Sequence, residues 1–128
     1  MALLDLAIDT AGSGIAIVAH TREPAEIEVQ LGGSAELPAA AVMSSLVQAL
    51  HAQARSLEVA TVTVDFTNLE FMNSSCFKSL VTWVNDVTEL PETKRYKIRF
   101  RTNAGIPWQR RSLHALKTMA TDLVTVEA

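Results

Sequence analysis

Residues 64–80 of the chain, VDFTNLEFMNSSCFKSL, join two different hydrophobic patterns. Around Val64 and Phe66 the apolar side chains alternate with polar ones, which is typical of a half-buried β-strand. From Ser74 onward they recur every three or four residues, which is typical of an amphipathic helix. The segment therefore predicts a strand that runs directly into a helix. The apolar face of that helix consists of Phe77, Leu80, Val81, Val84 and Val87.

The same two patterns account for the rest of the chain. Gly32, Gly33 and Ser34 are expected to end the third strand. Strands separated by helices lie parallel and are joined by right-handed crossovers, whereas the first two strands are close enough to pair antiparallel. We therefore expect an α/β fold with one mixed sheet of four to six strands and the helices mainly on one face. The predicted strands are 3–8, 14–20, 26–31, 59–66, 95–101 and 123–126, and the predicted helices are 38–55, 74–87 and 107–119.

Length and composition indicate one domain over residues 1–128, with an extra leading strand at about 3–9. With 128 residues, of which 48% are hydrophobic, such a chain buries roughly two-thirds of its unfolded surface. Cys76 is the only cysteine, so no internal disulfide can form, and a reducing compartment fits. We find no signal-peptide pattern and no apolar run of about 18 residues that would cross a membrane. The sequence predicts a soluble cytoplasmic protein.

No pattern in the sequence indicates catalysis, a metal site or a cofactor. His20, His51 and His114 are far apart and lie in different predicted elements, without metal-ligand spacing. The pair Gly32-Gly33 lacks both glycine-rich phosphate-binding patterns, and no nucleophile-elbow motif is present. We therefore expect a non-enzymatic protein with no cofactor and no metal.

The net charge of −3 conceals a marked asymmetry. Residues 1–92 carry 12 acidic and 3 basic side chains, whereas residues 93–128 carry 2 and 8. We favour a solvated sheet face on which Glu26 and Glu28 balance the basic strand. The alternative is a basic surface over 94–117 that binds nucleic acid or lipid headgroups. Of these two, nucleic acid is not the partner we expect. The basic residues concerned are Arg95, Lys97, Arg99, Arg101, Arg110, Arg111 and Lys117.

The junction between strand and helix allows two interpretations. Asn73 or Ser74 can cap the helix by accepting a backbone N–H of its first turn. The same helix end also stabilises added negative charge, so a phosphate on Ser74 would be well placed, with Lys78 four residues later to pair with it. Local chemistry alone favours the cap.

Residues 64–80 resemble the signature of STAS domains, the anti-sigma factor antagonist family. That signature is an apolar strand followed by D-[LF]-[ST]-x-[LV]-x-F-[IM]-D-S-[ST]-G-L and a helix. Asp65 to Met72 match it well, and the order of elements from about Gly14 to Val126 matches the family. The family's second Asp is Asn73 here, which keeps the cap but lacks the charge, and its Gly is Cys76, which adds bulk.

The resemblance implies a bacterial signal-transduction protein that regulates transcription by binding other proteins. Ser74, with Ser75 beside it, matches the serine that a partner kinase phosphorylates in that family. This kinase doubles as an anti-sigma factor, a phosphatase removes the phosphate, and the phosphate decides which partner is bound. We expect Asn73, Cys76 and Lys78 to belong to the partner-binding surface.

Several alternatives stay open beside this prediction. One is a STAS-fold scaffold in which the hydroxyls only cap, and another is the anion-binding module on 94–117. An oligomer is also compatible with the sequence. For Cys76 we favour a half-buried packing role over a low-pKa redox sensor. Trp83, off the main apolar stripe, either contributes to a protein interface or packs sideways, and Trp108 is expected to be a partly buried anchor.

Overall fold

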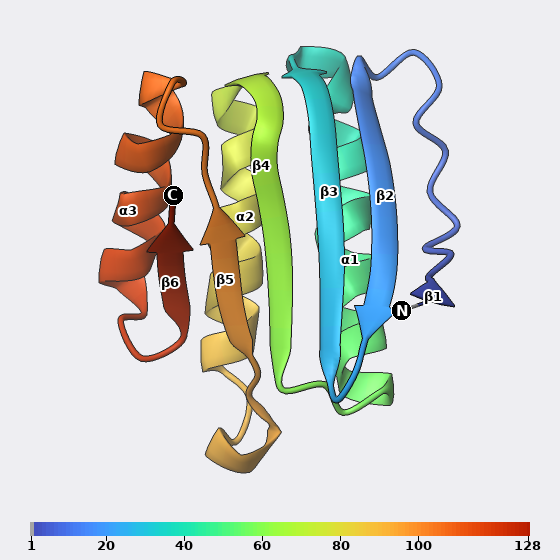
Figure 1. Cartoon of the computed structure of the whole chain (residues 1–128), viewed down its shortest axis with the longest axis vertical. Coiled ribbons are helices and arrows are strands. Elements are labelled where there is room, and N and C mark those ends of the chain that lie inside the picture. Colours follow the sequence, from blue (N-terminus) through green and yellow to red (C-terminus); the bar gives the residue numbers. More distant parts are fainter. Residues whose placement is uncertain (1) are drawn as a thin grey trace.

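The computed structural model describes residues 2–128 as a six-stranded sheet with helices behind it (Figure 1). The strands lie in the sheet in chain order; β1, β2 and β3 are antiparallel neighbours, and β3 to β6 are parallel. Helices α1 and α2 cover the sheet, and α3 flanks the edge formed by β5 and β6. The predicted mixed α/β sheet is confirmed. The elements are β1 (Ala2–Leu3), β2 (Ile15–Arg22), β3 (Glu26–Ala35), the 3-10 turn η1 (Leu37–Ala39), α1 (Ala40–Ser56), β4 (Thr61–Met72), α2 (Ser74–Thr88), the 3-10 turn η2 (Glu92–Lys94), β5 (Lys97–Arg101), α3 (Pro107–Met119) and β6 (Val124–Glu127).

The leading segment corrects the prediction of a strand at about 3–9. β1 is only 2 residues long. The side chain of Asp5 accepts the N–H of Ala7 at 2.8 Å, and that of Asp9 accepts the N–H of Ala11 at 3.0 Å. Ala7 has a positive φ of 56°. These local turns compete with strand pairing, because they bind backbone groups that a ladder would need.

The third strand does not end at its glycines, which corrects a second prediction. β3 continues to Ala35 and pairs with β4 through two shifts of register. Gly33 has a φ of +99°, and a Cβ there would collide with the carbonyl oxygen of Gly14. The same carbonyl accepts the N–H of Ser34 at 3.0 Å. The glycine therefore allows the backbones to approach closely instead of breaking the strand.

Strand β4 is longer than the predicted 59–66 and continues to Met72. Its first half lies between β3 and β5, but the pairing with β5 ends where Asp65 faces Arg101. Beyond that point β4 pairs on one side only, with the end of β3. This one-sided extension carries the chain to the start of α2.

Trp83 lies in the core, which decides between the two roles left open for it. Its side chain is 1% exposed, and its indole N–H donates to the hydroxyl of Tyr96 at 2.8 Å. The buried face of α2 also includes Cys76. This face is wider than the predicted stripe because α2 packs against α1 as well as the sheet, where Trp83 contacts Phe100 of β5. A protein interface through Trp83 is thus excluded in this fold.

Candidate functional site

The junction between β4 and α2 places the predicted serines at the surface. Asn73 is the N-cap of α2, and its side-chain oxygen accepts the N–H of Ser75 at 2.7 Å. Ser74 is the first residue of the helix, and both serines are exposed. Within residues 2–128, no hydrogen bond engages the hydroxyl of Ser74. Since Asn73 supplies the cap, this hydroxyl is free for other chemistry.

The junction is held from behind by the end of β3. The N–H of Asn73 donates to the carbonyl of Ala35 at 2.7 Å, and the thiol of Cys76 lies 3.5 Å from the carbonyl oxygen of Glu36. Cys76 is 0% exposed, so it is more buried than predicted. Burial raises the pKa of the Cys76 thiol and outweighs an opposing backbone hydrogen bond at Asn73. Its side chain does not reach the surface, which corrects the expectation that Cys76 contacts a partner.

Gln109 on α3 supports the end of β4 on the side where β4 has no strand partner. It is 0% exposed, and its side-chain amide donates to the carbonyls of Phe66 and Leu69 at 2.6 and 2.7 Å. Its amide oxygen accepts the N–H of Asn103 at 2.8 Å. One side chain thereby replaces part of the missing strand partner. Gln109 was not predicted from the sequence; its only signal there is a polar residue four positions before Leu113 on an apolar helix stripe.

Trp108 on α3 also binds the end of β4, and its ring lies beside Ser74. Its indole N–H donates to the carbonyl of Glu70 at 2.7 Å, and its ring is half-buried, as predicted for an anchor. The ring borders a shallow depression of about 200 Å³ between α2 and α3. Ser74 thus lies on the rim of a pocket with an aromatic wall. The lining residues are Met72, Ser74, Phe77, Trp108 and Ser112.

Two large apolar side chains stay exposed next to this junction. Phe71 is 46% exposed at the end of β4, and Leu37 is 65% exposed in η1. Leu37 follows Glu36, whose carbonyl lies against Cys76, so both exposed residues belong to segments that meet at the cap. Exposed aromatic and aliphatic groups around a polar site are typical of protein-recognition surfaces.

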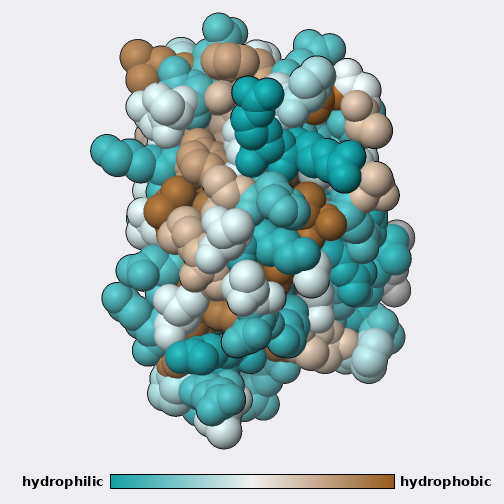
Figure 2. Space-filling model, turned by 90° about the vertical axis from the view of Figure 1, so that its left-hand side faces the viewer, coloured by the Kyte–Doolittle hydropathy of each residue, from teal (hydrophilic) through white to brown (hydrophobic). Residues whose placement is uncertain are grey.

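Further basic side chains lie on α2 and α3. Lys78 is exposed on α2, four residues after Ser74. No carboxylate in residues 2–128 forms an ion pair with Lys78 or with the basic residues of α3. Figure 2, which faces this side of the molecule, shows a mainly hydrophilic surface with scattered apolar groups. The exposed or half-buried basic residues of α3 are Arg110, Arg111, His114 and Lys117.

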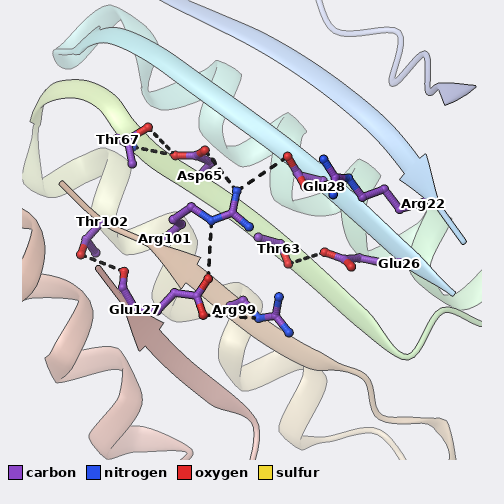
Figure 3. Close-up of polar contacts among 10 residues, drawn as sticks. All are labelled: Arg22, Glu26, Glu28, Thr63, Asp65, Thr67, Arg99, Arg101, Thr102 and Glu127. Atoms are coloured by element: carbon purple, nitrogen blue, oxygen red, sulfur yellow. Dashed lines mark hydrogen bonds and ion pairs between the residues drawn. The ribbon is translucent and has the colours of Figure 1, made fainter. Parts of the chain in front are cut away.

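On the basic strand, in contrast, Arg99 and Arg101 are paired with carboxylates within the sheet (Figure 3). Arg101 lies 3.5 Å from Asp65, 3.8 Å from Glu28 and 3.5 Å from Glu127. Desolvation lowers the pKa of Arg101, but these carboxylates outweigh it and raise the pKa above its ordinary value. The predicted balance by acidic residues is present. The strand that carries Glu28 is not the direct neighbour of β5, however, because β4 lies between them.

Glu28 differs from the solvated residue that the alternating pattern predicts. It is only 3% exposed, although it points to the face of the sheet that lacks helices. Its second carboxylate oxygen lies 3.0 Å from Arg22, an ion pair without hydrogen-bond geometry. The long side chains of Arg22 and Arg101 cover it, which explains the burial. On β5, Arg99 and Arg101 are therefore paired with carboxylates, whereas the basic side chains of α3 have no ion-pair partner within residues 2–128.

The three histidines remain separate in the fold. They lie on β2, α1 and α3, and His51 is paired through Nδ1 with the hydroxyl of Tyr96 at 2.7 Å. In residues 2–128 no three His, Cys, Asp or Glu side chains are grouped so that they could hold a metal ion. None of the helices in this part of the chain is both long and apolar enough to span a membrane.

Comparison with known proteins supports the fold and not a close relationship. No family model and no curated protein matches the sequence. Among solved structures, the crystal structure of an anti-sigma factor antagonist from Mycobacterium paratuberculosis is similar with a TM-score of 0.64. The match covers 89% of this chain and 87% of that chain, at 16% sequence identity. The protein thus has a STAS-like fold, the fold of that anti-sigma factor antagonist.

Proposed function

We propose that the protein is a non-enzymatic regulatory module that binds a partner protein through the surface around Ser74. In this proposal a phosphate on Ser74 switches the binding. The observation that carries it is the free, exposed hydroxyl of Ser74 beside an apolar pocket, at a helix end that Asn73 already caps. The likeness in fold to an anti-sigma factor antagonist supports it. The partners proposed are a serine kinase that acts as an anti-sigma factor and a phosphatase.

A phosphate suits this position for electrostatic reasons. The helix dipole favours negative charge at the start of α2, where an anion adds stability of about 0.3–1 kcal/mol when exposed. Lys78 lies one turn further along the helix and can pair with the phosphate. Asn73 replaces an aspartate of the family signature, so no carboxylate at this position repels the phosphate.

The pocket explains how a phosphate would change binding. Phe77 and Trp108 offer an apolar contact for one side chain of a partner. Phe71 and Leu37 are further exposed apolar side chains in the segments that meet at the cap. A doubly charged phosphate at the rim of the pocket keeps the pocket hydrated, because burying that charge beside apolar groups is costly. We therefore expect the unmodified protein to bind the apolar partner surface and the phosphorylated protein to release it.

Mass spectrometry of the protein isolated from its native cells tests whether Ser74 carries a phosphate. A pull-down from the same cells, followed by affinity measurement, then compares wild type with Ser74→Glu. We expect Ser74→Glu to weaken binding of the partner at least about tenfold, which corresponds to about 1.4 kcal/mol. Ser45→Glu adds the same charge at an exposed position of α1 and should leave the affinity unchanged. Unmodified serines together with equal affinities would reject the switch and leave a scaffold in which the junction only caps.

A second candidate function is binding of an anionic surface through α3. This helix contains no acidic residue, and its basic side chains lack ion-pair partners in the described chain. This second function predicts binding to anionic vesicles or nucleic acid, with an affinity that falls steeply as the salt concentration rises. No binding at about 50 mM salt would exclude this function.

A further inference from the structure

A depression of about 500 Å³ lies at the end of the sheet opposite Ser74, between the end of α1 and η2 (lower end in Figure 1). Its volume falls in the range of about 300–1,000 Å³ that small-molecule sites occupy. The α1 side contributes Arg55, Glu58 and Val59, and the η2 side contributes Lys94 and Arg95. None of these residues takes part in the surface around Ser74.

The charges lining this depression do not balance. Three side chains are basic and one, Glu58, is acidic, so the lining carries a net charge of about +2. Within residues 2–128, neither Arg55 nor Lys94 forms an ion pair. The positive charge at this place is therefore available to an anion.

Arg95 is held in position for such a role. Its Nε donates to the carbonyl of Leu90 at 3.0 Å, and its Nη2 donates to the carbonyl of Thr88 at 2.7 Å. These bonds occupy carbonyls at the end of α2 and leave Nη1 without a protein partner in the described residues. A guanidinium fixed in this way loses little conformational entropy when it binds an anion.

The C-terminal end of α1 would normally repel an anion, because its last carbonyls are unsatisfied. Here the chain folds back and satisfies three of them. The N–H groups of Leu57, Glu58 and Val59 donate to the last-turn carbonyls of Gln53, Arg55 and Ala54 at 2.9, 3.3 and 3.1 Å. Glu58 adopts a positive φ of 53° to close this turn. Fewer free carbonyl groups at the end of α1 therefore oppose a bound anion.

We propose that this depression binds a small organic phosphate, a phosphomonoester. A phosphomonoester carries nearly two negative charges at neutral pH and so matches the net charge of the lining. The two guanidinium groups and the ammonium group can donate to its three terminal oxygens. Val59 and the buried Ala54 offer apolar contact to the organic part, which inorganic phosphate lacks.

His51 provides an internal reporter of occupancy. It lies one helical turn before Arg55 on α1. Burial lowers its pKa, Asp86 raises it, and Arg55 lowers it further. A bound dianion would offset the charge of Arg55 and so raise the pKa of His51. The ring also contacts the hydroxyl of Tyr96, and that hydroxyl accepts a hydrogen bond from Trp83, so tryptophan fluorescence offers a second signal.

Calorimetric and NMR titrations of the full chain with adenosine 5′-monophosphate, glycerol 3-phosphate and inorganic phosphate test the proposal. We expect saturable binding of both esters, weaker binding of inorganic phosphate, and a shift of the His51 ring signals without a shift of His114. Arg55→Gln and Lys94→Gln should each weaken ester binding about five- to tenfold. Lys117→Gln, which removes a charge on α3, should leave it unchanged.

Three outcomes would overturn the proposal. They are no saturable binding of either ester up to about 10 mM, equal affinity for inorganic phosphate and the esters, and undiminished binding by the Arg55→Gln/Lys94→Gln double variant. Ser74→Glu should not alter ester binding, so failure here and failure of the proposed switch are distinguishable.

Discussion

At the scale of single residues, Asn73 and Ser74 differ in their hydrogen bonding. Asn73 makes the capping bond, and the hydroxyl of Ser74 is free in the described structure. A neutral amide caps a helix about as well as a carboxylate. Replacing the signature aspartate by asparagine therefore preserves the helix start while removing a charge.

This division predicts different effects on stability. Asn73→Ala should lower the free energy of unfolding by about 1 kcal/mol, because the N–H of Ser75 loses its acceptor. Ser74→Ala should change it by less than about 0.5 kcal/mol, as is usual for surface substitutions. Urea denaturation of the two variants measures both values. Equal losses would show that Ser74 shares the capping role.

His51 predicts a pH dependence of stability. The unfolded chain takes up a proton on this residue near pH 6.5, whereas burial lowers the pKa in the folded protein. Because the unfolded state binds more protons in this interval, the contribution to stability is complete above about pH 6.5 and is lost as the pH falls through the folded pKa. Asp86, Arg55 and Tyr96 are the other charged or titratable groups that act on it.

Denaturation at several pH values between about 7 and 5 tests this dependence. His51→Gln, which retains hydrogen-bonding groups but does not titrate, should show a smaller loss of stability on acidification than wild type. His114→Gln changes an exposed histidine on α3 and should behave like wild type. Identical pH profiles for all three proteins would contradict the assignment to His51.

At the scale of elements, the end of β4 depends on side chains for its second partner. Gln109, Asn103 and Trp108 bind carbonyls that β5 is too short to reach. Two of these side chains belong to α3, and the third lies in the loop before it. The start of α3 and the serine-bearing junction are therefore coupled through β4.

Gln109→Met should destabilise the protein by about 2–4 kcal/mol. The substitution conserves volume but leaves the buried carbonyls of Phe66 and Leu69 and the N–H of Asn103 without their partner. Gln48→Met is the matched control, since Gln48 is exposed on α1 and should lose less than about 0.5 kcal/mol. Thermal and urea denaturation give both values. A similar small loss for the two variants would mean that another group, such as water, replaces the Gln109 amide.

Prediction from the sequence succeeded for elements with a clear period and failed where tertiary contacts decide. The strand around Val64 and the helix from Ser74 were predicted because their patterns are local. The continuation of β3 through Gly33 was not predicted, since it depends on the close approach of the Gly14 backbone. The leading strand was overpredicted, because Asp5 and Asp9 interrupt its apolar run and form turns.

At the scale of the whole molecule, the opposite charges of the two halves of the sequence meet across the sheet. Arg101 on β5 contacts carboxylates from β3, β4 and β6 (Figure 3). Burial of Glu28 makes this pairing more consequential than a surface ion pair, because an unpaired buried charge is costly.

A double-mutant cycle measures this coupling. Arg101→Gln should cost about 1–3 kcal/mol, because Glu28 and Asp65 lose a counter-charge, and partial exposure of Arg101 limits the loss. In a Glu28→Gln background the same substitution should cost less, with a coupling energy of at least about 0.5 kcal/mol. Lys94→Gln, at an exposed position outside this cluster, is the control for the loss of a positive charge. Additive losses would show that the two residues act independently.

By itself, the sequence determined the α/β class, the order of strands and helices and the position of the serines at a helix start. These features follow from periodicity and capping, which are properties of neighbouring residues. Only the tertiary structure decided that the Ser74 hydroxyl has no partner within residues 2–128, that Cys76 and Glu28 are buried, and that Gln109 and Trp108 support the junction. Each of these depends on which distant segment lies alongside, and on how far each strand extends beyond its neighbour.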